Sequence, residues 1–164
     1  AAFRTRILAT DLFPINKPAD VESLWLADRL DDLLAASDVV ILCVPLTKQT
    51  RGFIAAEQFT RMKRGALLIN VARGEVVVER DLVAALEAGH LSGAGLDVTE
   101  IEPLPPESRL WDRHDVIITP HVGAQSARRV DDTTDLVCEN LRRYLAGEPL
   151  LNLVDKTLGF APPK

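Results

Sequence analysis

Polar or otherwise unusual side chains occur near the ends of five apolar runs of this sequence. Three of these side chains could together carry out acid/base chemistry on a small carboxylic acid. Arg73, Glu102 and His121 each come shortly after a separate run. A guanidinium binds a carboxylate through two parallel hydrogen bonds and does not deprotonate. A histidine exchanges one proton near neutral pH, and a carboxylate bonded to its other ring nitrogen fixes its tautomer. We therefore expect Arg73 to hold a small carboxylic acid, and Glu102 with His121 to form an acid/base pair.

Each of these residues also has a structural interpretation when it is taken alone. Asp11, after the first apolar run, can simply begin a turn. Arg73 can be a solvated loop cation, Glu102 a surface carboxylate and His121 a structural histidine. The functional interpretation depends on the coincidence, because an arginine, a carboxylate and a histidine that converge at one edge of a sheet form a catalytic arrangement.

A redox reaction at such a site needs a cofactor, because these side chains cannot supply a hydride. Asp11 stands where a dinucleotide-binding fold places the acid that accepts hydrogen bonds from the adenosine ribose hydroxyls. The negative charge of this acid would repel a 2′-phosphate. The sequence therefore favours NAD over NADP.

The elements that must position these residues are strands alternating with helices. The expected strands are residues 6–10, 39–44, 66–71, 93–98 and 116–119. Most are apolar at successive positions, which is typical of strands covered on both faces. Helical spacing occurs at residues 30–34, 55–62, 81–88 and 126–146. The alternation predicts a parallel α/β sheet in three α/β/α layers, and ligands bind such a sheet at the carboxyl ends of its strands.

The composition is that of an ordinary soluble globular chain. Its 164 residues are 47% hydrophobic and 26% charged, with a net charge of −5. The acidic balance gives no reason to bind nucleic acid or an anionic membrane, and no apolar run approaches the ~20 residues that span a bilayer. Cys43 and Cys138 fit neither a disulfide framework nor a metal site, and we expect reduced core thiols. We predict a soluble cytoplasmic protein that binds no metal.

Four ordered blocks of the sequence resemble the D-isomer-specific 2-hydroxyacid dehydrogenase family. They are DVVILCVPLTKQTRGFI at residues 38–54, MKRGALLINVARG at 62–74, residues 95–105 beginning GLDV, and ITPHVGA at 118–124. The resemblance extends over about residues 1–145. It implies a Rossmann-type NAD-binding domain of an oxidoreductase. Such an enzyme acts on the CH–OH group of its donor and transfers a hydride between NAD(H) and a small 2-hydroxy or 2-keto acid.

The resemblance gives the three central residues the roles expected from their chemistry. It implies that Arg73 binds the substrate carboxylate and carbonyl, that His121 is the general acid/base and that Glu102 supports His121. It further places Asp11 at the adenosine ribose and Asp97 at the nicotinamide carboxamide. The whole implied set of cofactor contacts is Asp11, Val44, Pro45, Thr50, Val71, Ala72, Arg73, Asp97, His121 and Gly123.

The start of the chain departs from the family pattern. Family members carry a Gly-x-Gly-x-x-Gly turn that holds the pyrophosphate, about 20 residues before the ribose acid, and no such turn precedes Asp11. The substrate domain that the family builds mostly from preceding residues is missing as well. We therefore expect residues 1–147 to be an incomplete NAD-binding domain without its first strand–helix unit, followed by a tail at 148–164. We expect such a fragment to be inactive alone.

Two further functions stay open at this point. Corepressors similar to this family use the same fold as a nucleotide-sensing dimer, so a sensing or dimerisation module is one alternative. A non-functional remnant is the other. The Arg73, Glu102 and His121 trio favours the enzyme, because a scaffold has no chemical need for all three. The resemblance also implies a homodimer formed through the cofactor domain and a small 2-hydroxy or 2-keto acid as substrate.

Overall fold

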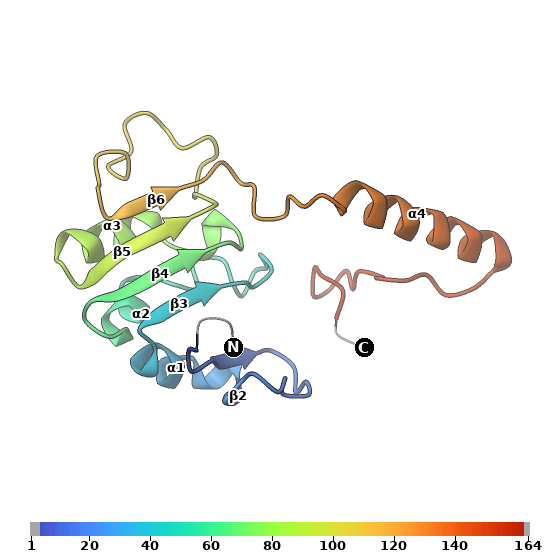
Figure 1. Cartoon of the computed structure of the whole chain (residues 1–164), viewed down its shortest axis with the longest axis horizontal. Helices are drawn as coiled ribbons and strands as arrows, with labels where there is room; N and C mark the ends of the chain where they lie inside the picture. Colours follow the sequence, from blue (N-terminus) through green and yellow to red (C-terminus); the bar gives the residue numbers. More distant parts are fainter. Residues whose placement is uncertain (1–3, 163–164) are drawn as a thin grey trace. The chain divides into compact units, whose positions relative to one another are not determined.

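The computed structural model describes residues 4–162, which form two compact units divided in the sequence between Pro120 and His121. Figure 1 shows the elements in chain order. The first unit contains β1 (Leu8–Asp11), β2 (Ser23–Leu26), α1 (Leu30–Ala36), β3 (Val39–Leu42), α2 (Ala56–Arg61), β4 (Ala66–Asn70), α3 (Glu79–Glu87), β5 (Leu91–Leu96) and β6 (Val116–Ile118). It also has two short 3-10 helices, η1 (Ala27–Arg29) and η2 (Gly74–Val76). The second unit contains α4 (Arg129–Ala146).

The described strands pair in parallel and form two sheets. One has four strands in the order β3-β4-β5-β6, and the other pairs β1 with β2. The carboxyl ends of the four neighbouring strands therefore lie along one edge, as Figure 1 shows. The predicted parallel α/β fold is confirmed. The strand β2 was not predicted.

The hydrophobic core lies between the four-stranded sheet and the helices α1, α2 and α3. Leu34 of α1, Phe59 of α2 and Leu82 of α3 are all fully buried, together with Leu68 of β4. Burial of one large apolar side chain contributes about 1.5–3 kcal/mol. These contacts hold the strands that carry the candidate site in a single packed unit.

The opposite face of the four-stranded sheet exposes apolar side chains. Ile41 of β3 and Ile117 of β6 are 60% and 72% exposed. The strand register places them in one row with Ile69 and Gly95 between them. Within residues 4–120 the helices cover one face only, so two layers are present there instead of the expected three. Runs that predicted burial on both faces are in fact buried on alternate residues, as in β3.

The expectation that both cysteines are core thiols is wrong, because Cys43 and Cys138 are exposed. Cys43 continues the exposed phase of β3, in which Val39 and Ile41 also point away from the core. Cys138 lies on α4, a helix that buries none of its residues. An apolar neighbourhood in the sequence did not distinguish the covered face of an element from its open face.

The second unit consists of residues 121–128, α4 and the segment that follows the helix. The helix ends at Gly147, whose left-handed φ of 69° makes it the C-cap that the sequence predicted. The following segment turns back along the helix, because Asn140 accepts a hydrogen bond from the Leu151 N–H at 2.7 Å and donates one to its carbonyl at 3.2 Å. Among the described residues, no helix combines the length and the apolar character needed to cross a membrane.

Candidate active site

Arg73 projects from a turn that directly follows β4. Asn70, the last residue of the strand, is buried, and its Oδ1 accepts a hydrogen bond from the Ala72 N–H at 3.0 Å. Its Nδ2 donates to the Arg73 carbonyl at 3.1 Å. The Arg73 side chain itself is exposed, and its Nη1 donates to the Ala72 carbonyl at 2.6 Å. The structure thus presents a guanidinium to solvent from a backbone that is anchored underneath.

The turn that carries Arg73 packs directly against the loop that carries Glu102. A Cβ atom added to Gly74 would lie only 1.8 Å from the Thr99 carbonyl oxygen, so no other residue fits there without moving the loop. The Thr99 N–H in turn donates to Glu102 Oε1 at 3.2 Å. The two loops that carry Arg73 and Glu102 are therefore brought together.

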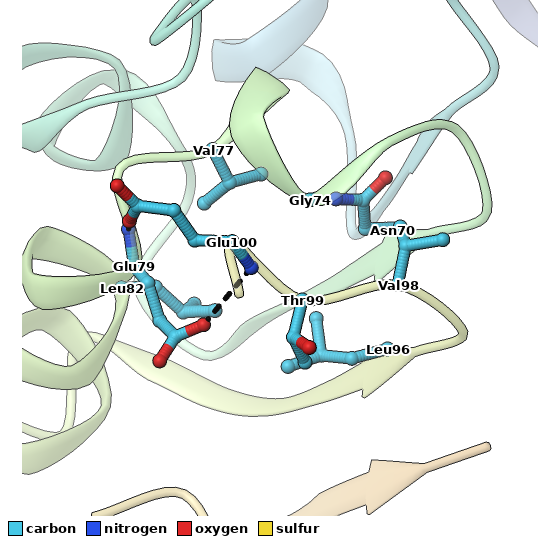
Figure 2. A pocket seen from close by; sticks show the side chains of 9 residues that line it. All are labelled: Asn70, Gly74, Val77, Glu79, Leu82, Leu96, Val98, Thr99 and Glu100. Atoms are coloured by element: carbon cyan, nitrogen blue, oxygen red, sulfur yellow. Dashed lines mark hydrogen bonds between the residues drawn. The ribbon is translucent and has the colours of Figure 1, made fainter. Parts of the chain in front are cut away.

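Glu79 and Glu100 connect the same two chain segments through a pair of reciprocal hydrogen bonds. The Glu79 N–H donates to Glu100 Oε2, and the Glu100 N–H donates to Glu79 Oε2, both at 3.2 Å. Figure 2 shows the two carboxyl groups beside a small cavity. The walls of this cavity are Asn70, Gly74, Val77, Glu79, Leu82, Leu96, Val98, Thr99 and Glu100. Because these walls are largely apolar and contain no cation, the cavity does not suit a carboxylate substrate.

Asp97 stands immediately after β5 and is almost fully buried. Its Oδ1 accepts a hydrogen bond from the Thr119 hydroxyl at 2.5 Å, and its N–H donates to the Asn70 carbonyl at 3.0 Å. A buried carboxylate needs such partners because the cost of removing it from water is high. These bonds fix Asp97 at the carboxyl edge of the sheet between the ends of β4 and β6.

Asp11 ends β1 in the two-stranded sheet. Its Oδ1 accepts a hydrogen bond from the Phe13 N–H at 2.9 Å, so it begins a turn, as the structural interpretation expected. An ionised carboxylate offers about four acceptor positions, and this one bond leaves capacity for ribose hydroxyls. The structural and functional interpretations of Asp11 are therefore compatible.

The predicted cofactor residues after β3 and β4 differ in what they can offer a ligand. The Thr50 hydroxyl donates to the Pro45 carbonyl at 2.6 Å, so its proton closes the loop after β3. Val44, before that proline, packs against the core cluster and is partly buried. Val71 exposes nearly half of its side chain, whereas the Ala72 methyl group belongs to the buried core. Among the three predicted cofactor residues that directly follow β4, Val71 is therefore the one whose apolar side chain is exposed to a ligand.

His121 is the first residue of the second unit. Its backbone is left-handed, with φ of 55°, and its side chain is exposed. Few residues other than glycine adopt this conformation, and such positions concentrate at functional sites. Gly123 lies in the same unit. The predicted trio is thus divided, with Arg73 and Glu102 in the first unit and His121 in the second.

Reasoning from the sequence missed the residues that hold the site together, namely Asn70, Thr99 and Thr119. Asn70 had a usable signal, since it is the one polar residue in the apolar run 66–71. A polar side chain at such a position must find a hydrogen-bond partner when the strand is buried. Thr119 carried a similar signal, since it is the one polar residue in the run 116–119, whereas Thr99 lies just after the run 93–98 and had none.

Two parallel sheets, with Asp11, Arg73 and Asp97 at the carboxyl ends of their strands, are typical of a dinucleotide-binding α/β domain. The family model described as "D-isomer specific 2-hydroxyacid dehydrogenase, NAD binding domain" matches residues 1–123. The chain belongs to this family, and the NAD-binding Rossmann-type fold expected from the resemblance is confirmed.

Two curated relatives of the chain are named as a glyoxylate reductase and a hydroxypyruvate reductase. It is 44% identical over 127 residues to a glyoxylate reductase of Pyrococcus horikoshii, a match covering 77% of this chain and 38% of that protein. It is 39% identical over 155 residues to a hydroxypyruvate reductase of Blautia hydrogenotrophica, covering 94% of this chain and 47% of that protein. The chain therefore spans less than half the length of these relatives.

Solved structures show the same fold. An NADPH-dependent glyoxylate/hydroxypyruvate reductase from Sinorhizobium meliloti, in complex with NADP and sulfate, superposes with a TM-score of 0.88 at 36% identity, covering 97% of this chain and 51% of that one. A D-isomer specific 2-hydroxyacid dehydrogenase from Xanthobacter autotrophicus, in complex with NADPH and MES, gives 0.82 at 37% identity, covering 92% and 70%. Binding of a nicotinamide dinucleotide is thus a property of the family.

Proposed function

We propose that this chain is the greater part of the cofactor domain of an enzyme that interconverts small 2-hydroxy and 2-keto acids. The observation that carries this proposal is the exposed Arg73 guanidinium, anchored at the carboxyl edge of the sheet beside the Glu102 loop. A guanidinium in such a place binds a carboxylate bidentately. The names of the relatives, which include a glyoxylate reductase and a hydroxypyruvate reductase, support this substrate class.

The residues at the strand ends fit NAD(H). Asp11 keeps acceptor capacity for ribose hydroxyls, and the buried, fixed Asp97 suits an amide donor such as the nicotinamide carboxamide. The charge of Asp11 favours NAD over NADP. Ala72 would act through its backbone, because its methyl group is buried. The remaining proposed contacts are Val44, Pro45, Thr50, Val71, Arg73, His121 and Gly123.

In the proposed reaction, the bound cofactor supplies or accepts the hydride. Arg73 holds the substrate carboxylate and polarises the adjacent carbonyl group. His121 donates a proton to the carbonyl oxygen during reduction and takes it back during oxidation. Glu102 orients the imidazole of His121 through a hydrogen bond to its other ring nitrogen. These side-chain roles are the ones that the chemistry of the three residue types predicts.

The test is an absorbance assay of NADH oxidation by the protein that contains this chain, with glyoxylate and hydroxypyruvate as probes. We expect at least one of them to be reduced, and Arg73→Leu to raise the KM for that acid. Arg64→Leu is the matched control, because Arg64 is also exposed but precedes β4. Binding of NADH without reduction of any 2-keto acid would favour the nucleotide-sensing alternative instead.

The resemblance also supports a homodimer formed through the cofactor domain and a cytoplasmic location, and both belong to the proposal. Analytical ultracentrifugation of the same protein tests the first of these. A single species with the mass of one chain would exclude the homodimer.

A further inference from the structure

Asn70 is the most deeply buried polar side chain among the described residues, with 1% of its surface exposed. It ends β4, the strand that leads into the Arg73 turn. Its backbone carbonyl accepts the hydrogen bond from the Asp97 N–H, which also ties it to the end of β5. One residue thus stands where the strand, the arginine turn and the Asp97 loop meet.

Both ends of the Asn70 carboxamide are used on the short segment that follows. Its Oδ1 accepts from the Ala72 N–H, and its Nδ2 donates to the Arg73 carbonyl. The Ala72 carbonyl in turn accepts from the Arg73 guanidinium. Figure 2 shows the Asn70 carboxamide directed at the turn beside Gly74. A side chain that binds the N–H of one residue and the carbonyl of the next restrains the peptide unit between them.

Only a group with a donor and an acceptor at one end can make both bonds. An alanine at this position provides neither, and it would leave the Ala72 N–H without its partner in a buried site, which is costly. An ionised aspartate keeps the acceptor but places a negative charge beside the Arg73 carbonyl oxygen. A protonated aspartate, in contrast, has one donor and one acceptor and reproduces the asparagine pattern.

The far end of the turn is held as well, by the contact of Gly74 with the Thr99 carbonyl. With Asn70 at one end and Gly74 at the other, the backbone of the turn has little freedom. The direction in which the Arg73 side chain leaves the backbone is then set by these two anchors, because the Cα–Cβ bond follows the peptide geometry.

We propose that Asn70 is a positioning residue for Arg73: its carboxamide holds the backbone of residues 72–73 so that the guanidinium meets the carboxylate of a 2-keto acid. The inference rests on the proposed function of Arg73. It adds a residue that does not touch the substrate but determines how well the arginine binds it.

The first experiment compares Asn70→Ala and Asn70→Asp with the unchanged protein that contains this chain, using glyoxylate as the probe. At neutral pH we expect both variants to raise the KM for glyoxylate roughly tenfold to hundredfold, the range for a displaced binding group. We expect a smaller change in the dissociation constant of NADH. Leu68→Ala is the control, because Leu68 is fully buried on the same strand but contacts no part of the turn by hydrogen bonds. It should lower the melting temperature and leave the KM unchanged.

The pH profile separates positioning from a general loss of stability. As the pH falls and the introduced carboxylate of the Asn70→Asp variant becomes protonated, the ratio of its KM to that of the unchanged protein should return toward one. The Leu68→Ala ratio should stay constant over the same range. Asn70→Asp has nearly the size and shape of the original residue, so it keeps the test available if Asn70→Ala does not fold.

A second readout does not require activity. In the 164-residue chain, the Arg73 Nε–H resonance, assigned through Arg73→Lys, should move or broaden in both Asn70 variants and stay in place in Leu68→Ala. Folded Asn70 variants with an unchanged Arg73 resonance would overturn the positioning role, and so would an unchanged KM. A shifted Arg73 resonance in a protein that reduces no 2-keto acid would support the positioning role and reject the proposed function.

Discussion

The residues at the candidate site are of two kinds: buried residues that hold the backbone, here called anchors, and exposed residues whose side chains can reach a ligand, here called working groups. Asn70, Asp97 and Thr99 are buried and have fixed hydrogen-bond partners, because an unpaired buried polar group costs about 1–3 kcal/mol. Arg73, after β4, and His121, the first residue of the second unit, carry exposed side chains. The anchors hold the backbone, and the working groups remain accessible to a ligand.

The acid/base role of His121 predicts a defect in turnover alone. In the protein that contains this chain, His121→Ala should lower kcat about 10²–10⁴-fold, the usual contribution of a general acid/base. The dissociation constant of NADH, measured by fluorescence titration, should change little. His114→Ala is the control, since His114 lies in an exposed loop. Unchanged turnover in His121→Ala would reject the assignment.

The charge of Asp11 predicts the choice between the two dinucleotides. Asp11→Asn keeps an oxygen for the Phe13 N–H and removes the negative charge that repels a 2′-phosphate. The kcat/KM ratio of NADH to NADPH should fall about tenfold, and Asp20→Asn, an exposed neighbour, should leave it unchanged. An identical ratio in Asp11→Asn and in the unchanged protein would contradict the ribose assignment.

Among the elements, β4 and β5 with the loops at their carboxyl ends form the scaffold of the site. Their register is parallel, and the loops touch where Gly74 meets Thr99. The reciprocal bonds of Glu79 and Glu100 strengthen the same junction. The relative positions of Arg73 and Glu102 are therefore a property of two strands, which is more precise than two free loops would allow.

The close approach at Gly74 predicts a large effect from a single methyl group. Gly74→Ala should lower the free energy of unfolding by about 1–3 kcal/mol, because the new Cβ would collide with the Thr99 carbonyl. Gly89→Ala is the comparison, since no atom lies within 4 Å of its Cβ position and its cost is limited to the strain of a φ of 61°. Urea unfolding measures both. Equal losses in the two variants would argue against the collision.

The ion pair of Arg113 and Asp115, just before β6, predicts how the free energy of unfolding depends on pH. Arg113 donates two hydrogen bonds to the carboxylate, at 2.8 and 2.6 Å, and these lower the pKa of Asp115. The folded-state pKa is below the unfolded value of about 4, so the stabilisation is complete above that value and is lost as the pH falls through the folded-state pKa.

Asp115→Asn should therefore lower the free energy of unfolding at neutral pH by about 1 kcal/mol and flatten its decline in acid. Urea unfolding over a series of pH values measures this dependence. Asp112→Asn, at an exposed position of the same loop, is the control. A decline in acid that matches the unchanged chain would show that another carboxylate is responsible.

For the whole molecule, exposed apolar surface is the prominent feature. The uncovered face of the four-stranded sheet carries Ile41 and Ile117, and α4 exposes Val137, Leu141 and Tyr144 along its length. Contiguous apolar patches of this kind on soluble proteins mark surfaces that bind other groups.

The open sheet face predicts strong binding of a hydrophobic fluorescent dye by the 164-residue chain. The double variant Ile41→Thr with Ile117→Thr should lower the dye fluorescence, because both side chains lie in one row of that face. Ile101→Thr is the control, since Ile101 is equally exposed but lies in the loop after β5. An equal decrease in the control would show that the dye does not bind the sheet face.

The sequence by itself determined the element types, the parallel topology and the residues at the strand ends. Apolar runs and helical spacing are local, and Asp11, Arg73, Asp97 and His121 stand at the ends of such runs or within two residues after them. The ordered blocks around them also sufficed to indicate the family. Short-range patterns are enough for these conclusions, because strand and helix periodicity are properties of neighbouring residues.

Only the tertiary structure decided what each side chain meets. It showed that Ile41 and Cys43 lie on an open face, although the run 39–44 that contains them is as apolar as the other runs. It also showed that Asn70 forms hydrogen bonds to the backbone of the Arg73 turn and that the Thr99 carbonyl, in the loop after β5, leaves room only for a glycine at position 74. Burial and hydrogen-bond partners depend on segments far away in the chain, and no local pattern contains that information.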